Sequence, residues 1–256
     1  MKRSNDLSNP IRLSRAFQQP LKWRGVLPLA LLLAACGGGG SGSAPASVAV
    51  PKAWGSAALI ETNNAGNAAD PQLASDPNGN ALAVWSQSDG THNNIVANRY
   101  IAGTGWGTAV PIESNNPDIA LLPQIAFDAS GNALAVWRQS DGTRENIWSN
   151  RYTAGAGWAT AMLIVTNNAG NAFAPQYAID VSGNALAVWH QFDGTRFSIW
   201  SNRYTIGTGW GTAELIETDT GGAFGPQIAV DASGNAMAIW EQFDGTSSNI
   251  RANRYE

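Results

Sequence analysis

The chain has 256 residues, of which 44% are hydrophobic and only 13% are charged, and Gly (28) and Trp (11) are abundant. This composition excludes a disordered tail, which would need fewer apolar and more charged side chains. The sequence also lacks the sustained Leu, Glu, Lys and Ala heptads of a helical bundle. Short runs of Val, Ile, Ala and Trp between clusters of Gly, Asn and Asp predict an all-β chain instead, with one large domain or two small ones.

The first 35 residues are typical of an export signal. A basic lead precedes the short apolar stretch VLPLALLLAAC (26–36), which is too brief to span a bilayer comfortably. Residues 33–36, Leu-Ala-Ala-Cys, resemble the lipobox of bacterial lipoproteins, in which the signal is cut before the cysteine and the thiol carries diacylglycerol. We therefore expect a signal peptide at 1–35 and a lipidated Cys36 rather than a buried thiol. Cys36 is the only cysteine, so a disulfide within the chain is impossible.

Residues 36–53 have the composition of a flexible tether. The stretch GGGGSGSAPASVAVP (37–51) would let a folded domain stand off a membrane surface to which the lipid is anchored. Gly37, rather than Asp, follows the cysteine, and by resemblance to the sorting pattern of Gram-negative lipoproteins this favours the outer membrane. The side of that membrane on which the domain lies is left open.

Removal of the signal also changes the charge balance. Six of the 15 cationic residues and one of the 19 anionic residues precede Cys36, so the remainder carries a net charge near −9. A nucleic-acid-binding protein needs cationic stripes that neutralise phosphates. The sequence has none, and we expect no nucleic-acid partner.

Tryptophans mark an internal repeat. Four of them are spaced by 52 residues, and a second series keeps this spacing until a final step of 51. A fixed period of this length predicts stacked supersecondary units, here over residues 54–256 with units starting near 54, 106, 158 and 210. The two series are Trp54, Trp106, Trp158 and Trp210, and Trp85, Trp137, Trp189 and Trp240.

Each unit contains four candidate strands joined by recognisable turns. The last unit shows three of them at 226–231, 235–243 and 249–255, and the fourth type is seen at 210–218. Asp-x-x-Gly-Asn joins the first two strands, Asp-Gly joins the next two, and Gly-Thr-Gly-Trp leads into the fourth. Both faces of the second strand are apolar, which suits a sheet packed on both sides. The pattern predicts a four-bladed β-propeller of four-stranded antiparallel blades.

The ends of the repeat region indicate how the propeller closes. It begins with a strand of the fourth type at Trp54 and finishes after a third strand at Tyr255. We therefore expect the N-terminal strand, residues 54–62, to complete the last blade and hide its edge. Pairing of two chains into a larger ring is the alternative.

The turn between the first two strands resembles a known family motif. DASGNAMAIW (231–240) is loosely similar to the Asp-box of sialidases, although its Ser follows the Asp and its aromatic residue falls later. The resemblance implies bacterial β-propeller repeats over residues 54–256. Asp-boxes in that family are structural turns remote from the active site, so the motif does not imply an enzyme.

Repeated charged residues are expected to hold the fold. One Asp ends each first strand and one Arg ends each third strand at the same end of the blade, which predicts pairing within each blade. A ligand role is the alternative, as is a calcium loop, although paired carboxylates are missing. The residues are Asp76, Asp128, Asp180 and Asp231, and Arg99, Arg151, Arg203 and Arg254.

Catalytic motifs are not found. His92 and His190 occupy different positions in their units, so no metal-ligand spacing results, and no Gly-x-Ser-x-Gly elbow is present. We expect neither a cofactor nor a metal, and enzyme activity is the minority interpretation.

Variation among the four units points to a binding surface. The Asp-x-x-Gly-Asn and Gly-Thr-Gly-Trp turns recur at one end of the blades, whereas the inter-blade loops and the residues after Asp-Gly vary at the other end. Ser86, Arg138, His190 and Glu241 also differ at one equivalent position. Blade packing is the favoured interpretation of two further variable residues, Trp148 and Trp200, with a sugar-stacking platform as the alternative. The candidate binding residues are Asn115, Arg144, Asn167, Arg196, Phe197, Trp148 and Trp200.

Three functions agree with these observations. The favoured one is an exported, lipid-anchored, non-catalytic module of the cell envelope that binds a glycan or a protein. A structural or assembly component of the outer envelope is the second, and a degenerate sialidase-like glycosidase is the third. Fold alone does not choose among them.

Overall fold

The computed structural model describes residues 53–114, 118–167 and 169–256, and its compact unit runs from Ser56 to Glu256. The signal segment, Cys36, the tether up to residue 52 and Asn115 lie outside the described residues, so the expectations placed on them stay predictions. In the part of the chain that is described, no helix has the length and apolar character needed to cross a membrane.

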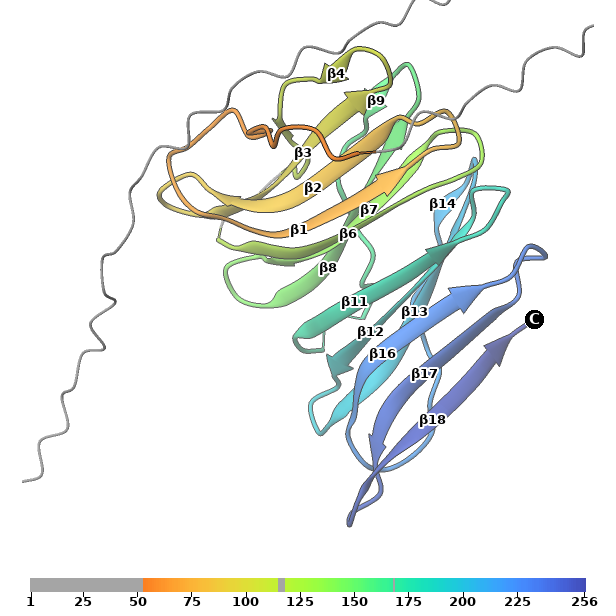
Figure 1. The fold of residues 1–256 in the computed structure, drawn as a ribbon. Coiled ribbons are helices and arrows are strands. Elements are labelled where there is room, and N and C mark those ends of the chain that lie inside the picture. The colour runs from red at the N-terminus through yellow and green to blue at the C-terminus, as the bar shows by residue number, and fades with distance from the viewer. Residues whose placement is uncertain (1–52, 115–117, 168) are drawn as a thin grey trace, which may run out of the picture. The chain divides into compact units, whose positions relative to one another are not determined.

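Four antiparallel sheets, called blades 1 to 4, follow one another along the compact unit (Figure 1). Their first three strands form a meander, as the sequence predicts. Blade 1 comprises β1 (Ala68–Ser75), β2 (Ala81–Ser88), β3 (Asn93–Ile101), β4 (Gly105–Trp106) and β5 (Val110–Pro111). Blade 2 comprises β6 (Ala120–Phe127), β7 (Ala133–Ser140), β8 (Glu145–Thr153), β9 (Gly157–Trp158) and β10 (Met162–Leu163). Blade 3 comprises β11 (Ala172–Ile179), β12 (Ala185–Phe192), β13 (Phe197–Thr205), β14 (Gly209–Trp210) and β15 (Glu214–Leu215). Blade 4 comprises β16 (Ala223–Val230), β17 (Ala236–Phe243) and β18 (Ser248–Tyr255).

The fourth strand of a blade is broken, not continuous as expected. In blade 1 its two short pieces, β4 and β5, both pair with β3. Between them the Asn98 amide donates a hydrogen bond to the Gly107 carbonyl (3.0 Å), so a side chain replaces part of the backbone ladder. The same bond runs from Asn150 to Ala159 and from Asn202 to Gly211.

The first strand of every blade carries a bulge near its start. The pairing register shifts there, for example between Phe173 and Gln176 in β11. The residue inside each bulge has a left-handed backbone, with φ of 53° at Asp70, 54° at Leu122, 49° at Ala174 and 58° at Gly225. Only Gly adopts this conformation without a steric cost. Three of the four bulges are therefore strained.

A buried tryptophan anchors the second strand of each blade. Its indole N–H donates to the side-chain oxygen of the glutamine two residues later, at 2.8 Å in blades 1 and 2 and 3.0 Å in blades 3 and 4. This bond satisfies a donor that would otherwise be costly to bury. The pairs are Trp85–Gln87, Trp137–Gln139, Trp189–Gln191 and Trp240–Gln242.

Consecutive blades pack in the same way each time. The first strand of the following blade lies against the face of the preceding one: β6 on blade 1, β11 on blade 2 and β16 on blade 3. Apolar clusters fill these interfaces, such as Leu134, Val136 and Ile164 with Ala185 and Trp189 between blades 2 and 3. Burial of both faces of the inner blades confirms the prediction of sheets packed on both sides.

The closure predicted for residues 54–62 is not shown by the structure. Ile60 in this segment accepts a hydrogen bond from Asn98 of blade 1 (2.8 Å), while the described part of blade 4 has three strands. Closure into a ring therefore stays a prediction.

Candidate functional site

The repeated Asp and Arg residues stabilise one end of the blades. Asp128 accepts hydrogen bonds from the backbone N–H groups of Ser130 and Asn132 (both 2.9 Å), and its buried carboxylate pairs with Arg151 at 2.9 Å. The expected pairing within a blade is thus found in blade 2, whereas Arg254 in blade 4 pairs with Glu256 at 2.8 Å. Burial alone would raise the pKa of Asp180, but hydrogen bonds from Asn184 and from backbone N–H groups hold it below its usual value.

The arginines also join one blade to the next. Arg99 lies over the ring of Tyr152, Arg151 over Tyr204, and Arg203 over Tyr255, at 5.3 to 5.5 Å from the ring centroid. Each pair links the third strand of a blade to the third strand of its neighbour through a cation–π contact. These residues therefore hold the array of blades together.

The Asp-Gly turns at the opposite, variable end have anchoring carboxylates. Asp141 accepts hydrogen bonds from the Thr143 hydroxyl (2.6 Å) and from the backbone N–H of Arg144 (2.8 Å). The Thr143 bond is the main cause that lowers the pKa of Asp141 to about 2, and Thr195 has the same effect on Asp193. These carboxylates stay ionised and fix the turns.

The predicted loop residues have different environments. Arg144 is exposed in its turn, and the side chain of Asn167 accepts a hydrogen bond from the N–H of Ala169 (3.2 Å). Arg196 pairs at 2.8 Å with Glu217, whose side chain is only 1% exposed, and also donates to the Gly221 carbonyl (2.9 Å). Arg196 thus links the β12–β13 turn of blade 3 to the segment between β15 and β16, which leads into blade 4. Sequence reasoning missed Glu217.

Trp148 and Trp200 lie within the packing of the blades. Trp148 pairs across the strands with Trp137 and packs on the core between blades 1 and 2. Trp200 pairs with Trp189 and packs on the core between blades 2 and 3. Both indoles are partly buried, which agrees with the packing interpretation.

An aromatic cluster at the variable end joins blades 3 and 4. It consists of Phe173, His190, Phe197 and Phe224, whose ring centroids lie 5.3 to 6.1 Å apart. Arg138 of blade 2 lies over the Phe173 ring at 5.6 Å and pairs with Glu145 at 3.3 Å. The cluster therefore has cationic and anionic groups at its border.

The repeat geometry explains why these residues meet. The variable position of the second strand contacts the bulge of the next blade: Ser86 donates to the Ala120 carbonyl (2.9 Å), and His190 contacts Phe224. Bulges redirect side chains and are common beside functional sites. Sequence reasoning missed Phe173 and Phe224 because both were assigned to inter-blade loops. Their replacement of Ala69 and Leu121 at the equivalent position was the available signal.

The chemistry of the cluster suits binding better than proton transfer. Burial lowers the pKa of His190 to about 4, so its imidazole is neutral near pH 7. Burial raises the pKa of Glu145, but the Arg138 charge opposes this effect. Phe224 is 40% exposed, so part of its ring is accessible to solvent. The described residues contain no group of three or more His, Cys, Asp or Glu side chains that would hold a metal ion.

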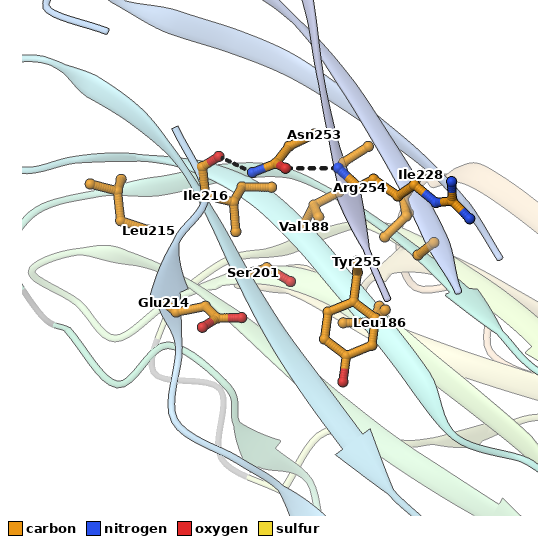
Figure 2. Close-up of a pocket in the computed structure, with 12 residues that line it drawn as sticks. Leu186, Val188, Ser201, Glu214, Leu215, Ile216, Ile228, Asn253, Arg254 and Tyr255 are labelled. Carbon is orange, nitrogen blue, oxygen red and sulfur yellow. Dashed lines mark hydrogen bonds between the residues drawn. The ribbon is translucent and has the colours of Figure 1, made fainter. Parts of the chain in front are cut away.

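A separate cavity of about 210 Å³ lies between blades 3 and 4 (Figure 2). Apolar side chains from blade 3, including Leu186 and Val188, line it together with Ser201, Ile228 and Tyr255. Next to it the Asn253 amide donates to the Ile216 carbonyl at 2.8 Å, as Figure 2 shows. Sequence reasoning did not predict this cavity.

Comparison with known proteins shows the fold. No family model matches the chain, and no curated protein matches it either. The family-93 α-L-arabinofuranosidase of Fusarium graminearum, solved with arabinobiose, is similar with a TM-score of 0.50 and 11% identity, over 77% of this chain and 65% of its own. An endo-arabinase from Bacteroides thetaiotaomicron gives 0.43 and 14%, over 77% and 79% of the two chains. The intramolecular trans-sialidase of Ruminococcus gnavus gives 0.43 and 13%, over 72% and 42%. The likeness to the arabinofuranosidase, at a TM-score of 0.50, supports the all-β architecture of propeller blades at the level of fold.

Proposed function

We propose that this chain is a non-catalytic binding module for a glycan, held at the outer membrane by a lipid on Cys36. The observation that carries the proposal is the aromatic cluster, because exposed aromatic faces beside charged and polar groups form stacking platforms for sugar rings. The cluster lies at the end of the blades where the four units differ. The similar solved structures are described as an arabinofuranosidase, an endo-arabinase and a trans-sialidase, which makes glycans the first ligands to test.

A glycan array probed with the full chain, purified in mild detergent, tests this proposal. We expect selective binding of a few glycans, and we expect Phe224→Ala to weaken that binding by roughly tenfold, as loss of an aromatic anchor does. The matched control is Phe243→Ala, since Phe243 is exposed to a similar extent (42%) on the neighbouring strand. Absence of binding to every glycan, or equal effects of the two substitutions, would contradict the proposal. Sugar release from bound glycans would instead support a glycosidase.

Arg196 is a poor reporter of ligand binding. Its ion pair with the buried Glu217 means that Arg196→Ala should also lower thermal stability. Arg144 is exposed in its turn, and Arg144→Ala is a second test of the loop surface.

Assembly with other chains is a second candidate function. The outward faces of blades 1 and 4 expose large apolar side chains, such as Leu73 (64%) and Ile250 (71%). Exposed apolar patches of this kind mark interaction surfaces. A pull-down from envelope extracts that recovers one dominant protein partner would favour this function over glycan binding.

A further inference from the structure

In blades 2 and 3 the tryptophan in the first short piece of the fourth strand packs in the interface between its own blade and the preceding one. Trp158 packs edge-on against Tyr152 of its own blade (5.6 Å), and Trp210 does the same against Tyr204 (5.6 Å). Both also contact the preceding blade, where the Trp210 indole donates to the Ser149 hydroxyl at 2.6 Å. A tyrosine, a serine and an apolar wall therefore define the place of this tryptophan.

The cavity between blades 3 and 4 has the same lining. Tyr255 is equivalent to Tyr204, and Ser201 is equivalent to Ser149, one unit further along the repeat. Figure 2 shows Tyr255 and Ser201 on the wall of this cavity together with Leu186 and Val188. No described residue of the chain fills it with an indole. The cavity thus has the form of a tryptophan socket.

The outward face of blade 4 has the same kind of side chains that blades 1 to 3 bury against the following blade. Ile250 is 71% exposed, whereas its equivalents in blades 1 to 3 are fully buried by the following blade. Met237 and Ile239 are likewise exposed, at 46% and 42%. The buried equivalents of Ile250 are Ile95, Ile147 and Ile199.

The outward face of blade 1 corresponds to the face that blades 2 to 4 pack against the preceding blade. Ala68 and Leu73 in β1 are exposed, although Ala120, Ala172 and Ala223 at the position of Ala68 are fully buried. The cation–π series has an unused member at each end, because Arg254 has no following tyrosine and Tyr100 has no preceding arginine within the described unit. The two faces are complementary, and they lie on the two end blades (Figure 1).

We propose that a second copy of this chain docks head to tail on blade 4. Blade 1 of the second copy covers Met237, Ile239 and Ile250, and its Trp54 enters the socket lined by Ser201 and Tyr255. Its residues 58 and 59 then pair with β18 at 251 and 252, as Val110 and Pro111 pair with β3 in blade 1. Trp54 keeps the 52-residue spacing of Trp106, Trp158 and Trp210, which assigns it to this position in the repeat.

A second copy fits the interface better than closure within one chain. With the three internal interfaces packed as they are, both end faces remain exposed. Closure within the chain would require these packed cores to change, whereas a second copy uses the same contacts unaltered. Head-to-tail contacts form a ring when the rotation closes. Two chains would give eight blades, which is within the usual range of propellers.

Native mass spectrometry of the full chain over a concentration series is the first test. We expect dimers, and we expect Ile250→Arg to raise the dissociation constant roughly a hundredfold or more, because a charge would be buried without a partner. Ile250 is exposed in the single chain, so the variant should fold, and it should melt like the parent at concentrations where the parent is monomeric. The matched control is Val181→Arg, at a 59% exposed position in the turn between β11 and β12. A monomer at all concentrations, or dimers unaffected by Ile250→Arg, would overturn the proposal.

Photo-crosslinking distinguishes a contact between two chains from a contact within one chain. The full chain carries p-benzoylphenylalanine in place of Trp54 and is co-folded as a mixture of ¹⁵N-labelled and unlabelled molecules. We expect crosslinks to peptides that contain Ser201 or Tyr255, with labelled joined to unlabelled peptides. Crosslinks to these peptides only between equally labelled partners would mean that the N-terminal segment of a chain docks on blade 4 of the same chain. Crosslinks to other peptides would mean that Trp54 does not enter the cavity lined by Ser201 and Tyr255. Either result rejects docking of a second copy.

Discussion

Asp128 combines two interactions that its equivalents share only in part. Its carboxylate fixes the turn after β6 and also pairs with Arg151, and both side chains are largely shielded from solvent (2% and 15% exposed). Loss of one member of a buried pair leaves the other charge uncompensated. We expect Asp128→Ala to lower the free energy of unfolding by about 3 kcal/mol, measured by chemical denaturation.

Asp231 supplies the matched control for this substitution. It makes the same turn hydrogen bonds, to the N–H groups of Ser233 and Asn235, but at an exposed position in blade 4. Asp231→Ala should therefore cost less stability than Asp128→Ala. Equal losses would show that the Arg151 pair contributes nothing.

His190 should make stability depend on pH between about 4 and 6.5. Burial lowers its pKa to about 4 in the folded chain, so in this range the unfolded chain binds a proton that the folded chain does not. Stability due to this residue is complete above pH 6.5 and is lost as the pH falls toward 4. Allowing for the partial exposure of the ring, we expect a loss of about 2 kcal/mol.

A pair of variants isolates this contribution. His190→Phe keeps an aromatic ring in the cluster and should flatten the curve of unfolding free energy against pH between 4 and 6.5. His92→Gln leaves His190 in place and should retain the slope of the parent. A His190→Phe curve as steep as that of the parent would refute the assignment.

At the residue level, the sequence predicted where some of the candidate residues lie. It placed Arg144, Arg196 and Phe197 at the variable end, and the structure puts them in or beside the hairpin turns there. It did not predict that Phe197 joins Phe173, His190 and Phe224, because rings from different blades meet only through inter-blade packing. A single sequence does not encode such contacts as a local pattern.

The bulges allow a test at the level of the strand. Ala174 has a left-handed backbone (φ 49°), which costs about 1 to 2 kcal/mol for a residue with a side chain. Ala174→Gly removes this strain but adds flexibility to the unfolded chain, so we expect a net gain of about 0.5 kcal/mol in unfolding free energy. Chemical denaturation measures the change.

The same substitution elsewhere in β11 is the control. Ala178 lies beyond the bulge, in the regular part of the strand that pairs with β12. Ala178→Gly should lower the free energy of unfolding by about 1 kcal/mol. Effects of the same sign at the two positions would argue against strain at the bulge.

Strand positions were largely predictable because turn residues bound them. The expected strands at 235–243 and 249–255 correspond to β17 and β18 within one residue. The first strand was predicted to start at Pro226, whereas β16 starts at Ala223, because the bulge lets pairing continue before the proline. The fourth strand was predicted as continuous because its sequence is apolar, and the side-chain bonds that interrupt it come from asparagines in another strand.

For the whole molecule, membrane attachment rests on Cys36, outside the described residues. We predict that the mature chain begins at a lipidated Cys36, since two or more acyl chains give stable anchoring. Metabolic labelling of cells with a fatty-acid analogue should mark the parent but not Cys36→Ala. Label that persists in Cys36→Ala would exclude this residue as the site of lipidation.

The indole protons that are bonded to glutamine in every blade can report how the molecule opens. Such a proton exchanges with solvent deuterium only when its own blade separates from its neighbours. Trp137 and Trp189 are flanked by blades on both sides, while Trp85 and Trp240 belong to the end blades. At dilutions where the chain is monomeric the blades form a linear stack, in which units at the ends open first and those inside open last. Each of the four tryptophans therefore reports the opening of one blade. Their order of exchange would reveal whether the blades open one after another from the ends or all together in a single event.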